Sequence, residues 1–161
     1  PSREKNFLFN LLETYLIEKL DELNRNNIKL KVIGRKIFSQ KLNKLLNYAE
    51  SKTKNNKTIQ INIALNYGSK TEIVYALNRL KKTKSKITES KISQNLYTYK
   101  IPDPDILIRT GNTSRLSNFL LWQLAYSEIF FEKKLWPDFN SNDYSKIIKK
   151  FKKIKRNFGN I

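Results

Sequence analysis

The 161-residue sequence predicts an α/β fold, a mostly parallel open sheet flanked by helices. Two observations lead to this class. Segments with the apolar pattern of strands alternate along the chain with segments that carry an apolar stripe at helical spacing, and such βα units place their strands in parallel. One strand segment, residues 106–108, is apolar throughout, as expected of a parallel strand covered on both faces.

Residues 1–66 contain two predicted helices and two predicted strands. Residues 1–23 carry apolar side chains at i, i+3 and i+4 spacing, which indicates a helix with one buried face. Residues 28–34 alternate apolar and basic side chains and stop at glycine, as a strand does. A second helix is predicted around residues 42–49, and isoleucines alternate with polar residues over 59–66 in a second strand.

The middle of the chain is predicted to pass from a helix to a buried strand through a surface connection. Residues 73–80 carry a helical stripe, and the polar, lysine-rich residues 81–100 are expected to hold one short helix at most. Pro102 and Pro104 exclude a helix just before the apolar strand at 106–108, because the residue before each proline is pushed to extended geometry.

Three more elements complete the predicted fold. Residues 117–126 are apolar almost all round, which predicts a buried helix that Ser117 caps. Residues 128–131 form the last strand, and residues 143–158 form a helix with one apolar and one basic face. The sequence has no internal repeat, so we expect residues 1–161 to make one domain. Its strands are few for an open sheet with a buried centre, so we expect a piece of this domain to be missing.

Composition excludes several classes of protein. The chain has no Cys and no His, so it forms no disulfide, no thiolate or imidazole zinc site and no imidazole-dependent triad. Its 32 Lys and Arg against 14 Asp and Glu give a net charge of +18. The cations are mostly lysine and no nucleic-acid motif is present, so we expect solvated lysines and no nucleic-acid partner. No uncharged window is long enough to cross a bilayer, so a cytoplasmic protein is expected.

A candidate anion site follows the strand at 106–108. Ligands of open α/β sheets bind beyond the carboxyl ends of the strands, and this strand ends directly in Arg109. Arg109 and Arg115 offer planar guanidinium groups for bidentate phosphate contacts. Gly111 permits close approach of the backbone, and Ser117 can cap a helix or donate to an oxyanion. The alternative is that both arginines pair with nearby carboxylates, for which the candidates are Asp103, Asp105 and Glu128.

Glu128 is the candidate metal ligand. It follows the predicted helix at the start of a strand, and a carboxylate near a bound diphosphate suits Mg²⁺, which prefers one or two carboxylates plus phosphate oxygens. The alternative is that Glu128 forms a salt bridge with an arginine, and spacing alone does not choose between the two.

Three stretches of the sequence carry a resemblance to a known family. Residues 102–111 read PDPDILIRTG, residues 115–128 read RLSNFLLWQLAYSE and residues 135–139 read LWPDF. Together they closely resemble the C-terminal signature of the cis-prenyltransferases, the undecaprenyl diphosphate synthase family. Further similarity at residues 1–4, 59–68 and 156–159 extends the resemblance over essentially the whole chain.

The resemblance implies an enzyme that condenses isopentenyl diphosphate onto an allylic diphosphate with Mg²⁺ and builds a polyprenyl diphosphate of the kind that serves as a cell-wall precursor lipid. The family's diphosphate-binding arginines and serine match Arg109, Arg115 and Ser117, with Leu116 inside the same segment. The family's metal-binding glutamate matches Glu128. The resemblance also implies a homodimer.

The sequence departs from the family in several places. The Asp-Gly-Asn-Gly-Arg segment, which supplies the catalytic aspartate, is absent from the 161 residues. We therefore expect the chain to be the C-terminal two thirds of such an enzyme, inactive alone. Asn112 and Thr113 stand where Gly and Glu are usual, and Asn157 stands where the family has an arginine near its dimer interface.

Three alternatives stay open. Some relatives lack the catalytic aspartate and support an active subunit, so the chain is either a transferase fragment or a non-catalytic partner subunit. Apolar side chains of the first helix, facing residues 73–77, line either a slot for the growing product or an ordinary core. The lysines of the last helix either contact anionic lipid or are solvated.

Overall fold

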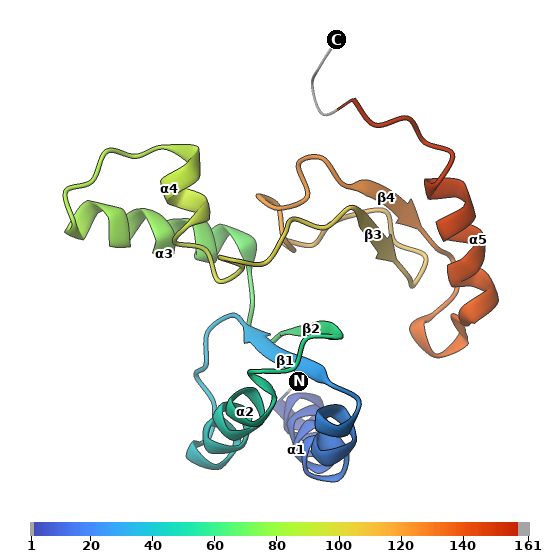
Figure 1. The fold of residues 1–161 in the computed structure, drawn as a ribbon, viewed down its shortest axis with the longest axis horizontal. Helices are drawn as coiled ribbons and strands as arrows, with labels where there is room; N and C mark the ends of the chain where they lie inside the picture. The colour runs from blue at the N-terminus through green and yellow to red at the C-terminus, as the bar shows by residue number, and fades with distance from the viewer. Residues whose placement is uncertain (1, 158–161) are drawn as a thin grey trace. The chain divides into compact units, whose positions relative to one another are not determined.

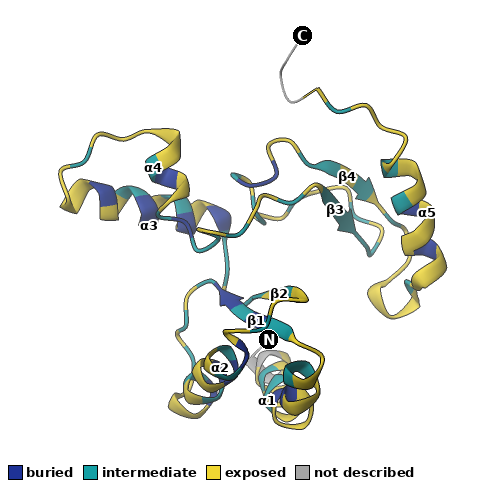
Figure 2. Cartoon of the chain, in the orientation of Figure 1, coloured by how far each residue is buried: buried dark blue, intermediate teal, exposed yellow. Residues whose placement is uncertain are grey.

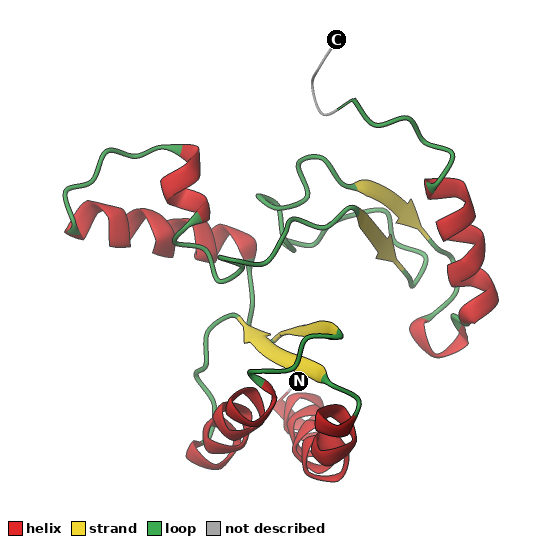
Figure 3. Ribbon diagram, viewed as in Figure 1, coloured by secondary structure: helices red, strands yellow, loops and turns green. Residues whose placement is uncertain are grey.

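The computed structural model describes residues 2–157, without the side chains of residues 2, 3 and 5. The chain divides into two compact units, Pro1–Tyr67 and Gly68–Ile161, and each is described by itself. Both units combine helices with a pair of parallel strands (Figures 1 and 3). The predicted α/β class and the parallel strands are therefore confirmed, with the strands arranged as two pairs.

The first unit contains two helices packed against a parallel strand pair. Its strands start in register, with Ile28 opposite Ile59. Leucines of both helices fill the core between the helices and β1, and Leu46 and Ala49 are fully buried (Figure 2). The elements are α1 (Ser2–Arg25), β1 (Ile28–Ile33), α2 (Gln40–Thr53) and β2 (Ile59–Ala64).

The outer edge of β1 is covered by side chains of α2. The amide of Leu30 donates to Thr53 Oγ1 at 3.0 Å, and the amide of Val32 donates to Glu50 Oε1 at 2.8 Å. An edge strand with unpaired N–H groups is a template for further strand pairing. Because the Leu30 and Val32 amides already donate to α2, they are not available to pair with a further strand on this edge of β1.

The second unit contains a helical part and a second parallel strand pair. Ala76 and Leu80 of its first helix pack with Ile92 and Leu96 in a small core. Its strands are in register with Ile106 opposite Glu128. The elements are α3 (Ser69–Lys82), α4 (Glu89–Ser93), β3 (Ile106–Arg109), β4 (Glu128–Phe131), the 3₁₀ turn η1 (Trp136–Asp138) and α5 (Ser141–Phe151).

Several predicted boundaries were wrong. The last helix ends at Phe151 rather than at residue 158, and residue 158 itself lies outside the described residues. Arg156 turns away from the helix, because its guanidinium binds Asp105 at 2.5 Å and the Tyr126 carbonyl at 3.0 Å. The strand at 106–108 is half-buried rather than covered on both faces.

The predicted buried helix at residues 117–126 was also wrong. This segment forms consecutive turns, and Ser117, Asn118 and Leu120 have positive φ angles of 48°, 61° and 45°. Tyr126 is 63% exposed, so the segment is not buried all round. Several of its polar groups bond to the first turn of α3, and within residues 117–126 a backbone bond of helical spacing joins the Leu124 amide to the Leu120 carbonyl. Across the described residues, no helix is long and apolar enough to span a membrane.

Candidate anion-binding site

The carboxyl end of β3 carries Arg109. Arg109 lies opposite Phe131 in the strand register, and its carbonyl accepts a hydrogen bond from the Glu132 amide at 2.7 Å. The side chain is half-buried, and its Nε donates to Thr113 Oγ1 at 3.0 Å. The strand pair thus fixes the backbone of Arg109, and the following loop fixes its side chain.

The loop after β3 is anchored to the segment that follows β4. The amide of Gly111 donates to the Lys134 carbonyl at 2.7 Å, and the amide of Asn112 donates to the Glu132 carbonyl at 3.2 Å. These two N–H groups are therefore already bonded and do not offer themselves to an anion. Gly111 has φ +90°, which strains any other residue, although a Cβ there would meet nothing within 4 Å.

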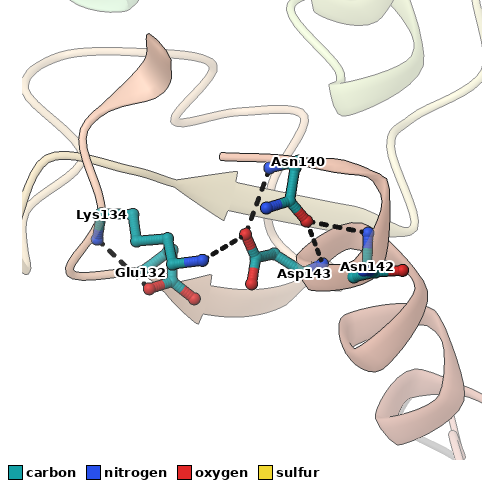
Figure 4. Close-up of polar contacts among 5 residues, drawn as sticks. All are labelled: Glu132, Lys134, Asn140, Asn142 and Asp143. Carbon is teal, nitrogen blue, oxygen red and sulfur yellow. Dashed lines mark hydrogen bonds and ion pairs between the residues drawn. The ribbon is translucent and has the colours of Figure 1, made fainter. Parts of the chain in front are cut away.

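Lys134 is held in turn by the start of α5 (Figure 4). Its Nζ lies 2.7 Å from Asp143 Oδ2, and that carboxylate also accepts the Asn140 amide at 3.1 Å. The Asn140 side chain accepts the amides of Asn142 and Asp143, which completes a capping box. The cap of α5 thereby fixes the residue whose carbonyl anchors Gly111.

This anchor depends on an ion pair whose two groups shift each other's titration. The Lys134 ammonium, followed by the Asn140 amide, lowers the pKa of the Asp143 carboxyl below its ordinary 3.8. The Asp143 carboxylate in turn raises the pKa of Lys134 above 10.5. The pair therefore contributes stability between these values, and it is lost as pH falls through the depressed pKa of Asp143 or rises through the elevated pKa of Lys134.

Acid is expected to loosen the loop anchor. As pH falls through the depressed pKa of Asp143, which lies below 3.8, hydrogen exchange of the Gly111 amide should accelerate in the wild-type chain, because protonation of Asp143 releases Lys134. Asp143→Asn should exchange faster already at neutral pH and show a flatter pH dependence, with the intrinsic acid dependence of exchange subtracted. The exposed Asp21 provides the control, since Asp21→Asn should leave the Gly111 profile unchanged. Parallel profiles for wild type and Asp143→Asn would contradict the role of the pair.

The remaining predicted anion ligands lie at the far end of the loop. Arg115 and Ser117 are exposed, and Leu116 between them is half-buried. Within the described part of the chain, neither Arg109 nor Arg115 forms an ion pair with a carboxylate. The alternative in which these arginines pair with Asp103, Asp105 or Glu128 is therefore wrong for the described residues, and Asp105 pairs with Arg156 instead.

Asn118, next to Ser117, caps α3 from a distance in sequence. Gly68 is the N-cap residue of α3 and has no side chain for capping. Asn118 supplies the missing cap. Its backbone carbonyl accepts a hydrogen bond from the Ser69 amide at 2.8 Å, and its side-chain Oδ1 accepts one from the Lys70 amide at 2.8 Å. These bonds satisfy two donors that a helix start leaves unpaired and place the Ser117 backbone relative to α3.

A buried carboxylate holds the same segment a few residues later. Glu72 is 0% exposed. Its Oε1 accepts the Tyr97 amide at 2.6 Å, and its Oε2 accepts Gln123 Nε2 at 3.2 Å. Gln123 Nε2 also donates to Thr98 Oγ1 at 2.9 Å. Glu72 therefore joins α3 to two stretches of chain that flank the β3 strand in sequence.

Glu128 lies at the other end of the strand pair. It faces Ile106 in the register, whereas Arg109 faces Phe131. Three residues along a strand span roughly 10 Å, so the structure does not bring Glu128 alongside Arg109. Its carboxylate forms no ion pair with any described residue, and its amide donates to the Asp105 carbonyl at 2.9 Å. Among residues 2–157, no three Asp, Glu, His or Cys side chains are grouped to hold a metal.

An apolar groove of about 450 Å³ lies within the first unit. It runs between α1 and the strand pair, and Leu8, Leu11, Leu12 and Tyr15 of α1 line it. Within the first unit, the facing side chains are those of Leu30, Ile61 and Ile63. Part of the α1 stripe is therefore an open surface, while Leu16 and Leu20 belong to the core.

Sequence reasoning missed the residues that hold the site. Asn140 and Asp143 had a usable signal, because Asn followed three residues later by an acidic side chain is typical of a helix start. Thr113, Asn118 and Glu72 act through partners 4, 48 and 51 residues away, and no local pattern indicates those contacts.

Comparisons with known proteins agree with one another. A family model described as putative undecaprenyl diphosphate synthase matches residues 1–159. An isoprenyl transferase from Rickettsia typhi is 46% identical over 160 residues, which cover 98% of this chain and 71% of the relative. An isoprenyl transferase from Fusobacterium nucleatum is 43% identical over 163 residues, with 100% and 70% covered.

Two solved structures have the same fold. A probable undecaprenyl diphosphate synthase from Campylobacter jejuni matches with a TM-score of 0.89 and 37% identity, over 99% of this chain and 76% of that chain. Lavandulyl diphosphate synthase from Lavandula x intermedia, in complex with dimethylallyl diphosphate, matches with a TM-score of 0.91 and 32% identity, over 99% and 72%.

Proposed function

The chain belongs to the undecaprenyl diphosphate synthase family of prenyltransferases, and from this premise we propose that its loop from Arg109 to Ser117 binds the diphosphate of isopentenyl diphosphate. The observation that carries the proposal is the positive charge of this loop. Arg109 and Arg115 follow the carboxyl end of β3, and neither is neutralised by a carboxylate among the described residues. Two such guanidinium groups attract a diphosphate.

In this proposal each residue of the loop has a separate task. Arg109 and Arg115 hold phosphate oxygens through their terminal N–H groups, and Ser117 donates its hydroxyl. Leu116 belongs to the same binding segment. The apolar groove in the first unit offers a surface for a prenyl chain, because its lining is almost entirely aliphatic and aromatic. Holding two substrates in register lowers the barrier to forming the new carbon–carbon bond.

Glu128 is the proposed ligand of Mg²⁺. The fit is partial, since Glu128 supplies one carboxylate and the described residues offer no larger cluster. Mg²⁺ bound by few carboxylates completes its shell with phosphate oxygens and water. When bound, it would neutralise charge on the diphosphate. The support for Glu128 is the family resemblance together with its lack of an ion-pair partner in the described chain.

We further propose that residues 1–161 form one domain, the C-terminal two thirds of a cis-prenyltransferase, with the catalytic aspartate supplied outside these residues. Homodimer formation and contact with anionic lipid through the exposed lysines of α5 belong to the same proposal. On α5 Ile147 is buried, so part of its apolar face packs within the chain, and lipid contact would fall to the lysines.

Titration of the chain with isopentenyl diphosphate tests the function. We expect saturable binding, measured by calorimetry or by amide shifts of residues 109–117, and tighter binding with Mg²⁺. Isopentenyl alcohol, which lacks the diphosphate, should not compete. Absence of binding, combined with stimulation of another prenyltransferase subunit by the chain, would favour the role of a non-catalytic partner.

Glu128→Gln separates metal binding from diphosphate binding. With Mg²⁺ present, the variant should bind isopentenyl diphosphate about tenfold or more weakly than wild type, because the amide is a weak metal ligand. Without Mg²⁺, its affinity should equal that of wild type. Glu89→Gln, on the exposed surface of α4, is the matched control and should retain the enhancement. Equal enhancement in Glu128→Gln and wild type would remove Glu128 from the metal site.

A further inference from the structure

Arg109 is held at one point of its guanidinium group. An arginine side chain has five N–H bonds, one at Nε and four at the two terminal nitrogens. The Nε–H donates to Thr113 Oγ1 at 3.0 Å, and no terminal N–H of Arg109 has a hydrogen-bond partner within the described chain. The guanidinium is therefore oriented through its inner nitrogen, while its outer edge keeps the donors that bind phosphate bidentately.

The position of Thr113 is itself fixed. Thr113 is half-buried, and the two residues before it are bonded through their amides to the carbonyls of Lys134 and Glu132. One end of the Arg109–Thr113 contact is thus held in β3 and the other is tied to the segment that follows β4, and the contact closes the loop across four residues. The Thr113 hydroxyl is uncharged, so it orients the arginine without reducing its positive charge.

We propose that Thr113 is a positioning residue that orients Arg109 for bidentate contact with the diphosphate. The inference rests on the proposed function of the loop. Thr113 does not touch the substrate in this proposal. It removes rotational freedom from Arg109 before the ligand arrives, which lowers the entropic cost of binding.

The test compares two substitutions at one position. Thr113→Val removes the hydroxyl at nearly constant shape, and it should weaken isopentenyl diphosphate binding about three- to tenfold, the effect of one hydrogen bond. Thr113→Ser keeps a hydroxyl and should restore affinity to within about twofold. Thr110→Val is the control for a lost threonine hydroxyl in the same loop, because the Thr110 side chain has no hydrogen bond within the described chain, and it should bind as wild type does.

The Nε–H signal of Arg109 gives a readout independent of the ligand. Nuclear magnetic resonance should show this proton protected from exchange in wild type and Thr113→Ser, and unprotected in Thr113→Val. In an Arg109→Ala background, Thr113→Val should have no further effect on affinity. If the wild-type chain binds and Thr113→Val binds equally well, the positioning role is overturned while the proposed function stands. If no variant binds isopentenyl diphosphate but the Nε–H behaves as expected, the proposed function fails instead.

Discussion

Arg115→Ala is expected to weaken binding of isopentenyl diphosphate by roughly ten- to a hundredfold, because a charged hydrogen-bond donor to phosphate contributes about 1.5–3 kcal/mol. Arg115 is exposed and unpaired among the described residues, so its removal leaves no buried group unsatisfied. The loss should therefore appear in affinity and not in stability. Calorimetric titration with isopentenyl diphosphate measures it directly.

The matched control is Arg79→Ala. Arg79 is also exposed and lies against the Tyr75 ring on α3, away from the loop in sequence. Arg79→Ala lowers the net charge by the same amount as Arg115→Ala, so a general electrostatic effect would weaken binding equally in both variants. In an enzyme completed with the catalytic segment, Arg115→Ala should raise the KM for isopentenyl diphosphate far more than the KM for the allylic primer. Equal changes in both constants would contradict the assignment of Arg115 to the isopentenyl diphosphate site.

Glu72→Ala is expected to lower the free energy of unfolding of the second unit by about 2–4 kcal/mol. The substitution leaves the half-buried Tyr97 amide without its acceptor, deprives the buried Gln123 of one partner, and opens a cavity at a side chain that is 0% exposed. Each unsatisfied buried group costs about 1–3 kcal/mol. Urea unfolding followed by Trp122 fluorescence reports on this unit.

Two further variants test whether the loss of stability in Glu72→Ala comes from the buried hydrogen bonds. Glu72→Gln keeps an acceptor for the Tyr97 amide and should cost less than Glu72→Ala. Glu18→Ala, at an exposed position of α1, should change stability by at most about 0.5 kcal/mol. A Glu72→Ala variant as stable as Glu18→Ala would show that the buried network does not hold the second unit together.

The residues that hold the loop differ in kind from those that bind the ligand. Arg109, Arg115 and Ser117 are expected to touch the diphosphate. Asn118 and Thr113 instead use short, rigid hydrogen bonds to fix the backbone and a guanidinium. Binding residues can be exposed and lightly packed because the ligand satisfies them, whereas positioning residues need defined partners in the free protein.

The sequence by itself determined the strands, the first three helical stripes and the position of the two arginines at and after the end of β3. These features depend on periodicity within a few residues and on the rule that ligands bind at the carboxyl ends of parallel strands. The pairing of β1 with β2 and of β3 with β4 also followed the expected parallel arrangement.

Only the tertiary structure decided what happens to residues 117–126. Their apolar composition predicts a helix, but Asn118, Leu121 and Gln123 bond to the first turn of α3, and the segment forms turns instead. The same holds for α5, which ends early because Arg156 binds Asp105. Local composition records how strongly a segment prefers a helix, whereas the bonds that override this preference come from residues about 50 positions away, whose proximity exists only in the folded chain.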